Sequence, residues 1–374
     1  MQYNKDKNTL AFFALLKAGL WEEQARLSSF DDIDYKRVYE LSQEQSVVGL
    51  VAAGLEHVVD VKLPKEDVLT FVGSTLQLER RNKSMNSFIV GLMERLKNEG
   101  IYALLVKGQG IAQCYERPLW RACGDVDLFL DKENYSKAKD ILTPIAQEVE
   151  EEVAESLHLP MMISGWEVEL HGTLRPDLGA HINRMVDLLQ KDTFENERAR
   201  VWENGDTEVL LPAPDNDIVF VFTHILQHFY RGGIGLRQVC DWCRLLWTYK
   251  NEVDKELLWS RLQEMGFMPE WKAFAALAVD YLGMPVEAMP MYDNDSRWKR
   301  KAETVLSIIL ETGNFGHSKD VSYYERHSRL GAKVISVWKH TEDSLKVFVL
   351  FPKHATIAWW RMVVWGVKRA AKGK

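Results

Sequence analysis

The fold is decided by the stretch from Tyr102 to Leu130, which reads YALLVKGQGIAQCYERPLWRACGDVDLFL. The pattern predicts a strand, a glycine turn, a short helix and a second strand that carries Asp125 and Asp127. Side chains alternate across a strand, so these two carboxylates point to the same face. They repel each other and resist burial, which indicates that a cation binds between them. Mg²⁺ with a substrate phosphate fits this arrangement best.

A second acidic strand is predicted further along the chain, in the sequence WEVELH from Trp166 to His171. Alternation puts Glu167, Glu169 and His171 on one face of that strand. A two-aspartate strand followed by an acidic strand is how a metal-dependent nucleotidyl-transfer site is built. Three roles stay open for His171: it orients Glu169, contacts the nucleotide or closes the core as a satisfied histidine.

These segments resemble the uncharacterised nucleotidyltransferase family of the polymerase-β-like superfamily. The family pattern joins a Leu-Leu-Lys-Gly turn to an Asp-hydrophobic-Asp strand and a later hydrophobic-acid-hydrophobic-His strand. The matching positions are Leu104, Leu105, Lys107, Gly108, Ala112, Tyr115, Arg121, Asp125, Asp127, Leu128, Val168, Glu169, Leu170 and His171. A later helix with spaced histidines and a Leu-Arg…Asp element match at His224, His228, Leu236, Arg237 and Asp241. The chain departs from the pattern at Val106, at Cys123-Gly124 and in having Glu rather than Asp as third carboxylate.

The resemblance implies transfer of a nucleoside monophosphate from an NTP, with Mg²⁺ or Mn²⁺ as cofactor. Asp125, Asp127 and Glu169 are the expected catalytic and metal-binding residues, and Glu169 supports the general base or is itself that base. Lys107 and the turn Gly108-Gln109-Gly110 are expected to bind the phosphates, because glycine lets backbone N–H groups approach closely. The alternative for this turn is a plain strand-to-helix connection with an exposed lysine.

Further residues are predicted near the nucleotide. Arg121 is either a second phosphate clamp or a salt-bridge partner of the two aspartates. A pocket wall is expected from His171, His224, His228, Arg231, Arg237 and Asp241. His224 and His228 have the spacing of a metal pair, but no HExxH motif is present, so pocket lining or simple packing is preferred. Asp241 is equally suited to be a structural partner of Arg237 or Arg244.

Hydrophobic periodicity predicts an α+β protein with a small mixed-sheet nucleotidyltransferase core between two helical regions. The predicted divisions are an N-terminal helical region 1–100, an α/β core 101–212 and a C-terminal helical domain 213–374. The predicted helices cover 8–28, 35–58, 65–98, 135–147, 217–230 and 236–250, with further helices to about 312, one at 333–349 and a last one after Pro352. The stretch 65–98 is either one long helix or two in series. The predicted strands cover 101–106, 125–130, 153–159 and 161–171, joined at Pro160, with a short strand at 209–211.

Composition describes a globular chain: of 374 residues, 46% are hydrophobic and 27% are charged. The net charge of −7 makes general nucleic-acid binding unlikely and an RNA end a less favoured acceptor. The polar start predicts no secretory signal, and four scattered cysteines predict a reduced, cytoplasmic protein. The Cys240–Cys243 pair lies in a hydrophobic helical pattern, which disfavours a metal or redox role.

The C-terminal helix is rich in tryptophan and basic residues, and no acid follows Phe351. Its residues of this kind are Trp359, Trp360, Trp365, Arg361, Lys368, Arg369, Lys372 and Lys374. Such a helix either contacts an anionic membrane surface weakly or packs its tryptophans on the preceding helices, and packing is favoured. Two other function classes stay open beside the enzyme: a catalytically silent nucleotide-binding protein, and a helical scaffold or membrane-surface interaction protein.

Overall fold

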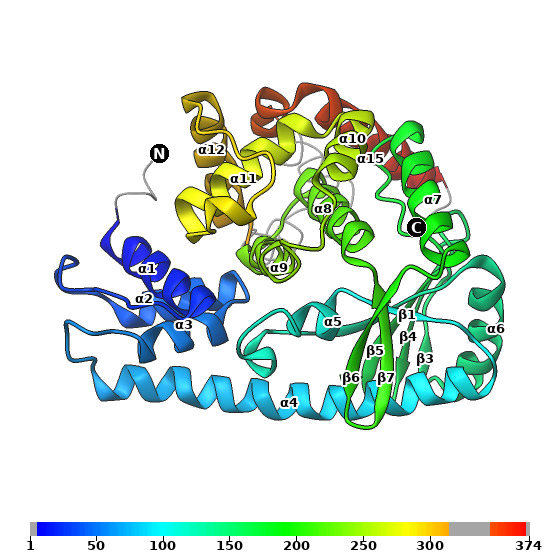
Figure 1. Cartoon of the computed structure of the whole chain (residues 1–374), viewed down its shortest axis with the longest axis horizontal. Helices are drawn as coiled ribbons and strands as arrows, with labels where there is room; N and C mark the ends of the chain where they lie inside the picture. The colour runs from blue at the N-terminus through cyan, green and yellow to red at the C-terminus, as the bar shows by residue number, and fades with distance from the viewer. Residues whose placement is uncertain (1–5, 314–344, 372–374) are drawn as a thin grey trace.

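The computed structural model describes residues 6–313 and 345–371, and Figure 1 shows a small sheet with helices before and after it in the chain. This confirms the predicted α+β class. Three short 3₁₀ helices complete the elements given below, at Pro118–Trp120, Thr143–Ile145 and Val286–Ala288.

The chain begins with the helices α1 (Lys7–Trp21), α2 (Tyr35–Glu44), α3 (Val48–Glu56) and α4 (Lys65–Asn98). Helices α1 and α3 approach each other at glycines: a Cβ on Gly19 would lie 1.8 Å from the carbonyl oxygen of Leu50. The single helix predicted over 35–58 is wrong, because the chain breaks at Ser46, where φ is 56°. The helix predicted over 8–28 ends early for the same reason, since Glu22 adopts a left-handed conformation.

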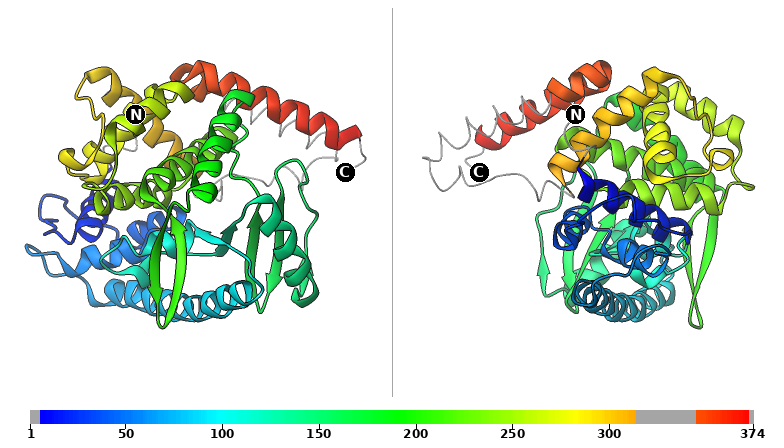
Figure 2. Two further views of the ribbon diagram at one scale, coloured as in Figure 1. Left: turned by 45° about the vertical axis from the view of Figure 1, so that its right-hand side comes forward. Right: turned by 90° about the vertical axis from the view of Figure 1, so that its left-hand side faces the viewer.

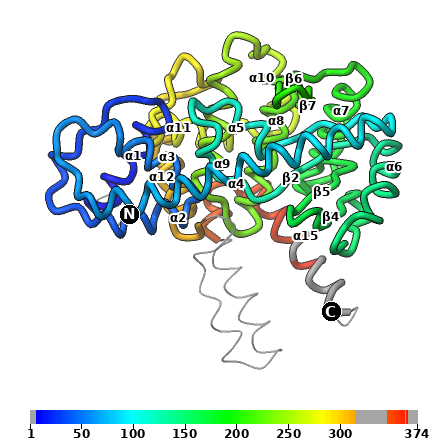
Figure 3. The backbone as a smooth tube through the Cα atoms, turned by 90° about the horizontal axis from the view of Figure 1, so that it is seen from below, coloured from blue at the N-terminus to red at the C-terminus, as the bar shows by residue number. Residues whose placement is uncertain are grey.

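Helix α4 is one continuous helix that contacts two hydrophobic clusters. Near its start, the ring of Phe71 lies 5.1 Å from that of Tyr39 in α2, and further along Met85 and Leu96 join the cluster under the sheet. Figure 3, in which the molecule is seen from below, shows α4 running from the N-terminal helices α1–α3 to the region of the sheet. The division into three regions at residues 100 and 212 stays a prediction.

The main sheet has five strands: β1 (Leu104–Val106), β2 (Asp125–Phe129), β3 (Glu148–Val149), β4 (His158–Ile163) and β5 (Trp166–His171). Their order is β1-β2-β5-β4-β3, with β2 and β5 parallel and the other pairs antiparallel. The predicted break at Pro160 is wrong, since this residue lies inside β4. The turn is at Ser164–Gly165, where both φ angles are positive, as a tight hairpin requires.

The two faces of the sheet pack against different helices. Val126 and Leu128 join α4 and α6 (Lys132–Leu142) in one hydrophobic cluster. On the opposite face, the ring of Phe129 lies 5.5 Å from that of Phe220 in α8 (Pro214–Arg231). In Figure 2, α8 lies above the sheet and α4 below it. The face that carries Asp125 and Asp127 is therefore the one turned towards α8.

Two elements between the sheet and α8 differ from the prediction. Helix α7 (Ala180–Glu195) was not predicted, although its buried Ile182, Val186 and Leu189 have helical spacing. The predicted strand 209–211 belongs to a hairpin of β6 (Ala199–Asn204) and β7 (Thr207–Pro212), which forms a separate two-stranded sheet. Strand β7 packs against β1 and α4, so it closes one edge of the core.

The later helices are α8, α9 (Leu236–Thr248), α10 (Lys255–Met265), α11 (Met268–Leu282), α12 (Ser296–Thr312) and α15 (Pro352–Ala371). Their core is aromatic: Phe222 lies 5.3 Å from Trp242 and 4.8 Å from Trp271 between ring centroids. Cys240 and Cys243 are free thiols buried in α9. The predicted helix 333–349 lies mostly outside the described residues. Among the described residues, no helix is long and apolar enough to cross a membrane.

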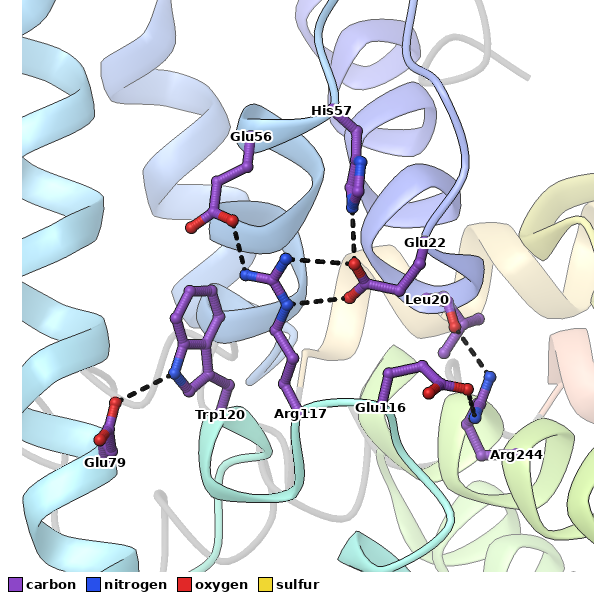
Figure 4. Close-up of polar contacts among 9 residues, drawn as sticks. All are labelled: Leu20, Glu22, Glu56, His57, Glu79, Glu116, Arg117, Trp120 and Arg244. Atoms are coloured by element: carbon purple, nitrogen blue, oxygen red, sulfur yellow. Dashed lines mark hydrogen bonds and ion pairs between the residues drawn. The ribbon is translucent and has the colours of Figure 1, made fainter.

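Arg117 ties the N-terminal helices to the loop that follows the first strand (Figure 4). Its guanidinium bonds Glu22 at 3.0 and 3.1 Å and Glu56 at 2.7 Å, and it stacks 4.6 Å from the ring of Trp120. His57 approaches the same Glu22 carboxylate at 2.6 Å. This network fixes the ends of α1 and α3 against residues 116–120 and lies apart from the acidic face of the sheet.

Candidate active site

The register of the parallel pair β2 and β5 brings the predicted acids together. Asp125 lies opposite Glu167 and Asp127 opposite Glu169. All four carboxylates share one face, because each strand contributes residues two apart. Asp127 is buried, Asp125 and Glu169 are half-buried, and Glu167 is exposed. The sequence puts two acids on the same face of each strand, and the register of the two strands brings these two pairs of acids together in one cluster.

Lys107 supplies a positive charge to this cluster. It follows β1, whose last residue Val106 is paired with Asp127, and its ammonium lies 2.7 Å from the Asp127 carboxylate. Its φ of 56° is unusual for a residue other than glycine, and Gly108 continues the turn with a φ of 38°. Burial lowers the pKa of Lys107, but the charges of Asp127 and Glu169 outweigh burial and raise it above its ordinary value.

His171 lies between two of the carboxylates. Its Nε2 is 2.7 Å from Asp127 and 3.2 Å from Glu169. Burial would raise the pKa of Asp127, but Lys107 and His171 hold it below its ordinary value. The pKa of Asp125 is raised instead, first by the charge of Asp127 and then by burial. Within residues 6–313 and 345–371, the Asp125 carboxylate makes no hydrogen bond or ion pair, so it remains available for a cation.

His158 was not predicted, yet it belongs to the cluster. It begins β4 directly opposite His171, and its ring stacks on that ring at 4.8 Å with an interplanar angle of 16°. Its Nε2 lies 3.2 Å from Glu169. The ligand atoms of His158, Glu169 and His171 all lie within 4.8 Å of one another, and neither Asp125 nor Asp127 belongs to this set. A correct hairpin prediction at residues 164–165 would have paired the two histidines.

Helix α8 brings His224 and His228 towards the cluster. Their Nε2 atoms are 3.0 Å apart, so one imidazole donates and the other accepts. Burial, followed by the charge of Lys107, lowers the pKa of both rings, that of His228 to about 4. The charge of Glu169 has the opposite effect and raises the pKa of both rings, but by less. The helix therefore presents two neutral imidazoles to the acidic face.

Acidification is expected to destabilise the protein through His228. Its pKa is 6.5 when unfolded and about 4 when folded, so between these values the unfolded state binds more protons. The free energy of unfolding should therefore fall as pH drops from about 6.5 towards 4. His228→Gln should show a shallower fall between pH 6.5 and 5, measured by urea unfolding at several pH values. The exposed His181→Gln serves as control, and equal slopes in wild type and His228→Gln would contradict the assignment.

Arg231 is the last residue of α8, and its charge helps to lower the pKa of His228. It pairs with Asp177 at 3.3 Å, and the same carboxylate binds Arg361 of α15 at 3.0 Å. Trp360 next to Arg361 is exposed. The predicted basic surface also includes the side chains of Trp365, Lys368, Arg369, Lys372 and Lys374, which lie outside the described residues. The membrane prediction therefore stays untested.

Arg121 does not contact Asp125 or Asp127, and its predicted salt bridge with them is wrong. Its guanidinium binds Asp241 of α9 with two bonds of 3.0 and 2.6 Å, and both side chains are 5% exposed. The Tyr115 hydroxyl donates to the same carboxylate at 2.8 Å. A guanidinium held by two bonds in the core is positioned to join α9 to the loop before β2.

The expected partners of Asp241 also differ. Arg237 donates to the carbonyl of Ala122 at 3.0 Å, and Arg244 donates to the carbonyl of Cys114 at 2.7 Å. Burial, and then the charge of Arg121, lowers the pKa of Arg237. Among the charges that raise this pKa is that of Asp125, which links Arg237 to the acidic cluster.

The glycine turn divides into parts with different surroundings. Gln109 is buried and donates to the Asn82 side chain of α4 at 2.9 Å, so its amide faces away from the carboxylates. A Cβ on Gly110 would lie 2.8 Å from Leu211 in β7, which explains glycine at this position by packing. Lys107 and Gly108 are the parts of the turn beside the cluster, and the short helix α5 (Gly108–Ala112) begins there. The first N–H groups of a helix lack helical partners.

The sequence model of a family described as uncharacterised nucleotidyltransferases matches residues 31–283, which is more than half of the chain. The match spans the acidic strands, the Lys107 turn and the helices α8 and α9. Comparison with curated proteins and with solved structures found no match. The chain therefore belongs to the uncharacterised nucleotidyltransferase family, the one that its Asp-x-Asp and Glu-x-His strands resemble.

Proposed function

We propose that the protein transfers a nucleoside monophosphate from an NTP to a hydroxyl-type acceptor, in a reaction that depends on Mg²⁺ or Mn²⁺. Membership of the family supports a nucleotidyltransferase role. The observation that carries the proposal is the convergence of Asp125, Asp127 and Glu169 on one face of two parallel strands. The proposal assigns the transfer core to residues 101–212, with helical regions 1–100 and 213–374 beside it.

The residues fit a divalent ion by charge and by donor type. Asp125 has no side-chain partner among residues 6–313 and 345–371, and its raised pKa reports repulsion from Asp127. Carboxylate oxygens are the ligands that Mg²⁺ prefers. Asp125, Asp127 and Glu169 would hold the ion, which neutralises triphosphate charge when it is bound.

The chain's own residues have distinct tasks in this reaction. Glu169 accepts the proton of the acceptor hydroxyl, or orients the base that does so. The acceptor oxygen forms a bond to the α-phosphorus, and the bond from this phosphorus to the pyrophosphate oxygen breaks. The ammonium of Lys107 lies 2.7 Å from Asp127 and would turn to a phosphate oxygen of the bound triphosphate. His224, His228 and Arg231 of α8 would line the nucleotide site opposite the acidic strands.

The acceptor is the open part of the proposal. A hydroxyl of a small molecule, a sugar or a protein side chain suits a chain of net charge −7 better than an RNA end does. Four free cysteines suit the reducing conditions of the cytoplasm, where we propose that the protein acts.

Thermal unfolding with each of ATP, GTP, CTP and UTP, with and without Mg²⁺, tests the proposal. A nucleotide at about 100 times its dissociation constant should add roughly 2.7 kcal/mol to the free energy of unfolding. This gain should require Mg²⁺ and should identify the preferred base. No gain with any nucleotide would contradict the proposal and favour a helical scaffold.

A further inference from the structure

We propose that His158, Glu169 and His171 bind a transition-metal ion through two imidazole nitrogens and one carboxylate oxygen, beside the aspartate pair. This site lies on the outer side of Glu169, on the antiparallel pair β4 and β5. Its place in the reaction rests on the proposed function, whereas the binding of the ion does not. The proposal distinguishes two ion sites of different chemistry that share Glu169.

The three ligand atoms are already close together. Glu169 Oε2 lies 3.2 Å from Nε2 of His158 and 3.2 Å from Nε2 of His171. The whole set lies within 4.8 Å. Bonds of about 2.1 Å in a tetrahedral site place two ligand atoms about 3.4 Å apart. The two contacts of 3.2 Å to Glu169 already match this spacing, and the widest pair of the set must close by up to roughly 1.4 Å.

The donors select the class of ion. Imidazole suits zinc, iron, nickel and copper, whereas all-oxygen sites suit Mg²⁺. Two histidines and one carboxylate leave further coordination positions open for water or substrate. Access is available from solvent, because the side chains of His158, Glu169 and His171 are 28%, 21% and 11% exposed.

One ring must turn to receive the ion. The rings of His158 and His171 are stacked almost parallel, and an ion must lie near the plane of each ring to meet its lone pair. We assign the rotation to His158, since it is the more exposed ring and begins its strand. Nε2 of His171 would exchange its contact with Asp127 for the ion, and Asp127 would keep Lys107.

A second histidine–glutamate pair in the chain shows what a purely structural pair looks like. His57 lies 2.6 Å from Glu22, and these side chains are 26% and 25% exposed, much like His158 and Glu169. There the guanidinium of Arg117 neutralises the carboxylate (Figure 4). On the sheet, by contrast, the charges of three carboxylates, Asp125, Asp127 and Glu169, act on the single ammonium of Lys107, so an excess of negative charge attracts a cation.

X-ray absorption of the full chain loaded with one equivalent of Zn²⁺, without nucleotide, tests the ligand set. We expect outer-shell scattering from two imidazole rings in wild type and from one in His158→Asn. No imidazole scattering in wild type would overturn the proposal without any variant. Two rings in both proteins would overturn it too, because the ion would then be bound by other histidines, such as His224 and His228.

Calorimetric titration with Zn²⁺ tests the affinity. His158→Asn should weaken binding by at least about tenfold. His57→Asn is the matched control and should bind Zn²⁺ as wild type does. Equal affinity in His158→Asn and wild type would overturn the proposal. The stabilisation of the protein by NTP with Mg²⁺ is measured in parallel. If the protein binds Zn²⁺ but is not stabilised by any NTP with Mg²⁺, only the proposed function is contradicted. If it is stabilised by an NTP but does not bind Zn²⁺, only this metal site is contradicted.

Discussion

Asparagine in place of Asp125 is expected to abolish the Mg²⁺-dependent stabilisation by nucleotide while leaving the nucleotide-free protein at least as stable as wild type. The carboxylate has no side-chain partner among residues 6–313 and 345–371, so its removal breaks no ion pair. Its raised pKa means that the charged form costs folding free energy at neutral pH, a cost that the amide removes. The variant should lose all of the stabilisation that nucleotide with Mg²⁺ gives to wild type, which is about 2.7 kcal/mol at a nucleotide concentration 100 times the dissociation constant.

Asp127→Asn is the informative comparison. This substitution also removes a proposed metal ligand, but it leaves Lys107 and His171 without the carboxylate that both contact at 2.7 Å. The nucleotide-free variant should therefore be less stable than wild type, whereas Asp125→Asn should not be. Urea unfolding and thermal unfolding of both variants, with and without NTP and Mg²⁺, separate the two effects. An undiminished nucleotide response in Asp125→Asn would remove this residue from the proposed site.

Asp241→Asn is expected to lower the free energy of unfolding by about 3–5 kcal/mol. The substitution keeps the side-chain volume but removes the charge that faces Arg121 in the core. It leaves the Arg121 guanidinium buried and uncompensated, near the buried Arg237. The measurement is urea unfolding at neutral pH.

A double variant shows whether the stability lost in Asp241→Asn is due to the unpaired charge of Arg121 or to a change in side-chain shape. Arg121→Met combined with Asp241→Leu removes both charges, so it should recover much of the stability that Asp241→Asn loses. If Arg121 were instead a free phosphate clamp, Asp241→Asn would change stability little, and Arg121→Met would weaken nucleotide binding alone. A loss below about 1 kcal/mol in Asp241→Asn would contradict the structural role.

Local patterns in the sequence were enough to predict most elements near the site. The alternation that predicts strands over 125–130 and 161–171 needs only neighbouring residues, and both strands are present, although the second begins only at Trp166. The predictions failed where a single residue adopts a positive φ. Ser46 breaks a helix, and Ser164 makes a turn that periodicity assigned to Pro160. Ser46 carries no local signal as strong as glycine or proline would, whereas Ser164 forms a Ser-Gly dipeptide with Gly165, a turn signal that the prediction did not use.

By itself, the sequence determined the class of fold, the family and the spacing of carboxylates along each strand, because these depend on residues close together in the chain. Only the tertiary structure decided which acids meet, that His158 faces His171, and that Arg121 pairs with Asp241, 120 residues away. Strand register and ion-pair partners depend on how distant hydrophobic faces pack against one another, so alternation within one strand cannot specify them. A guanidinium that is buried by this packing takes the carboxylate that the packing brings within reach.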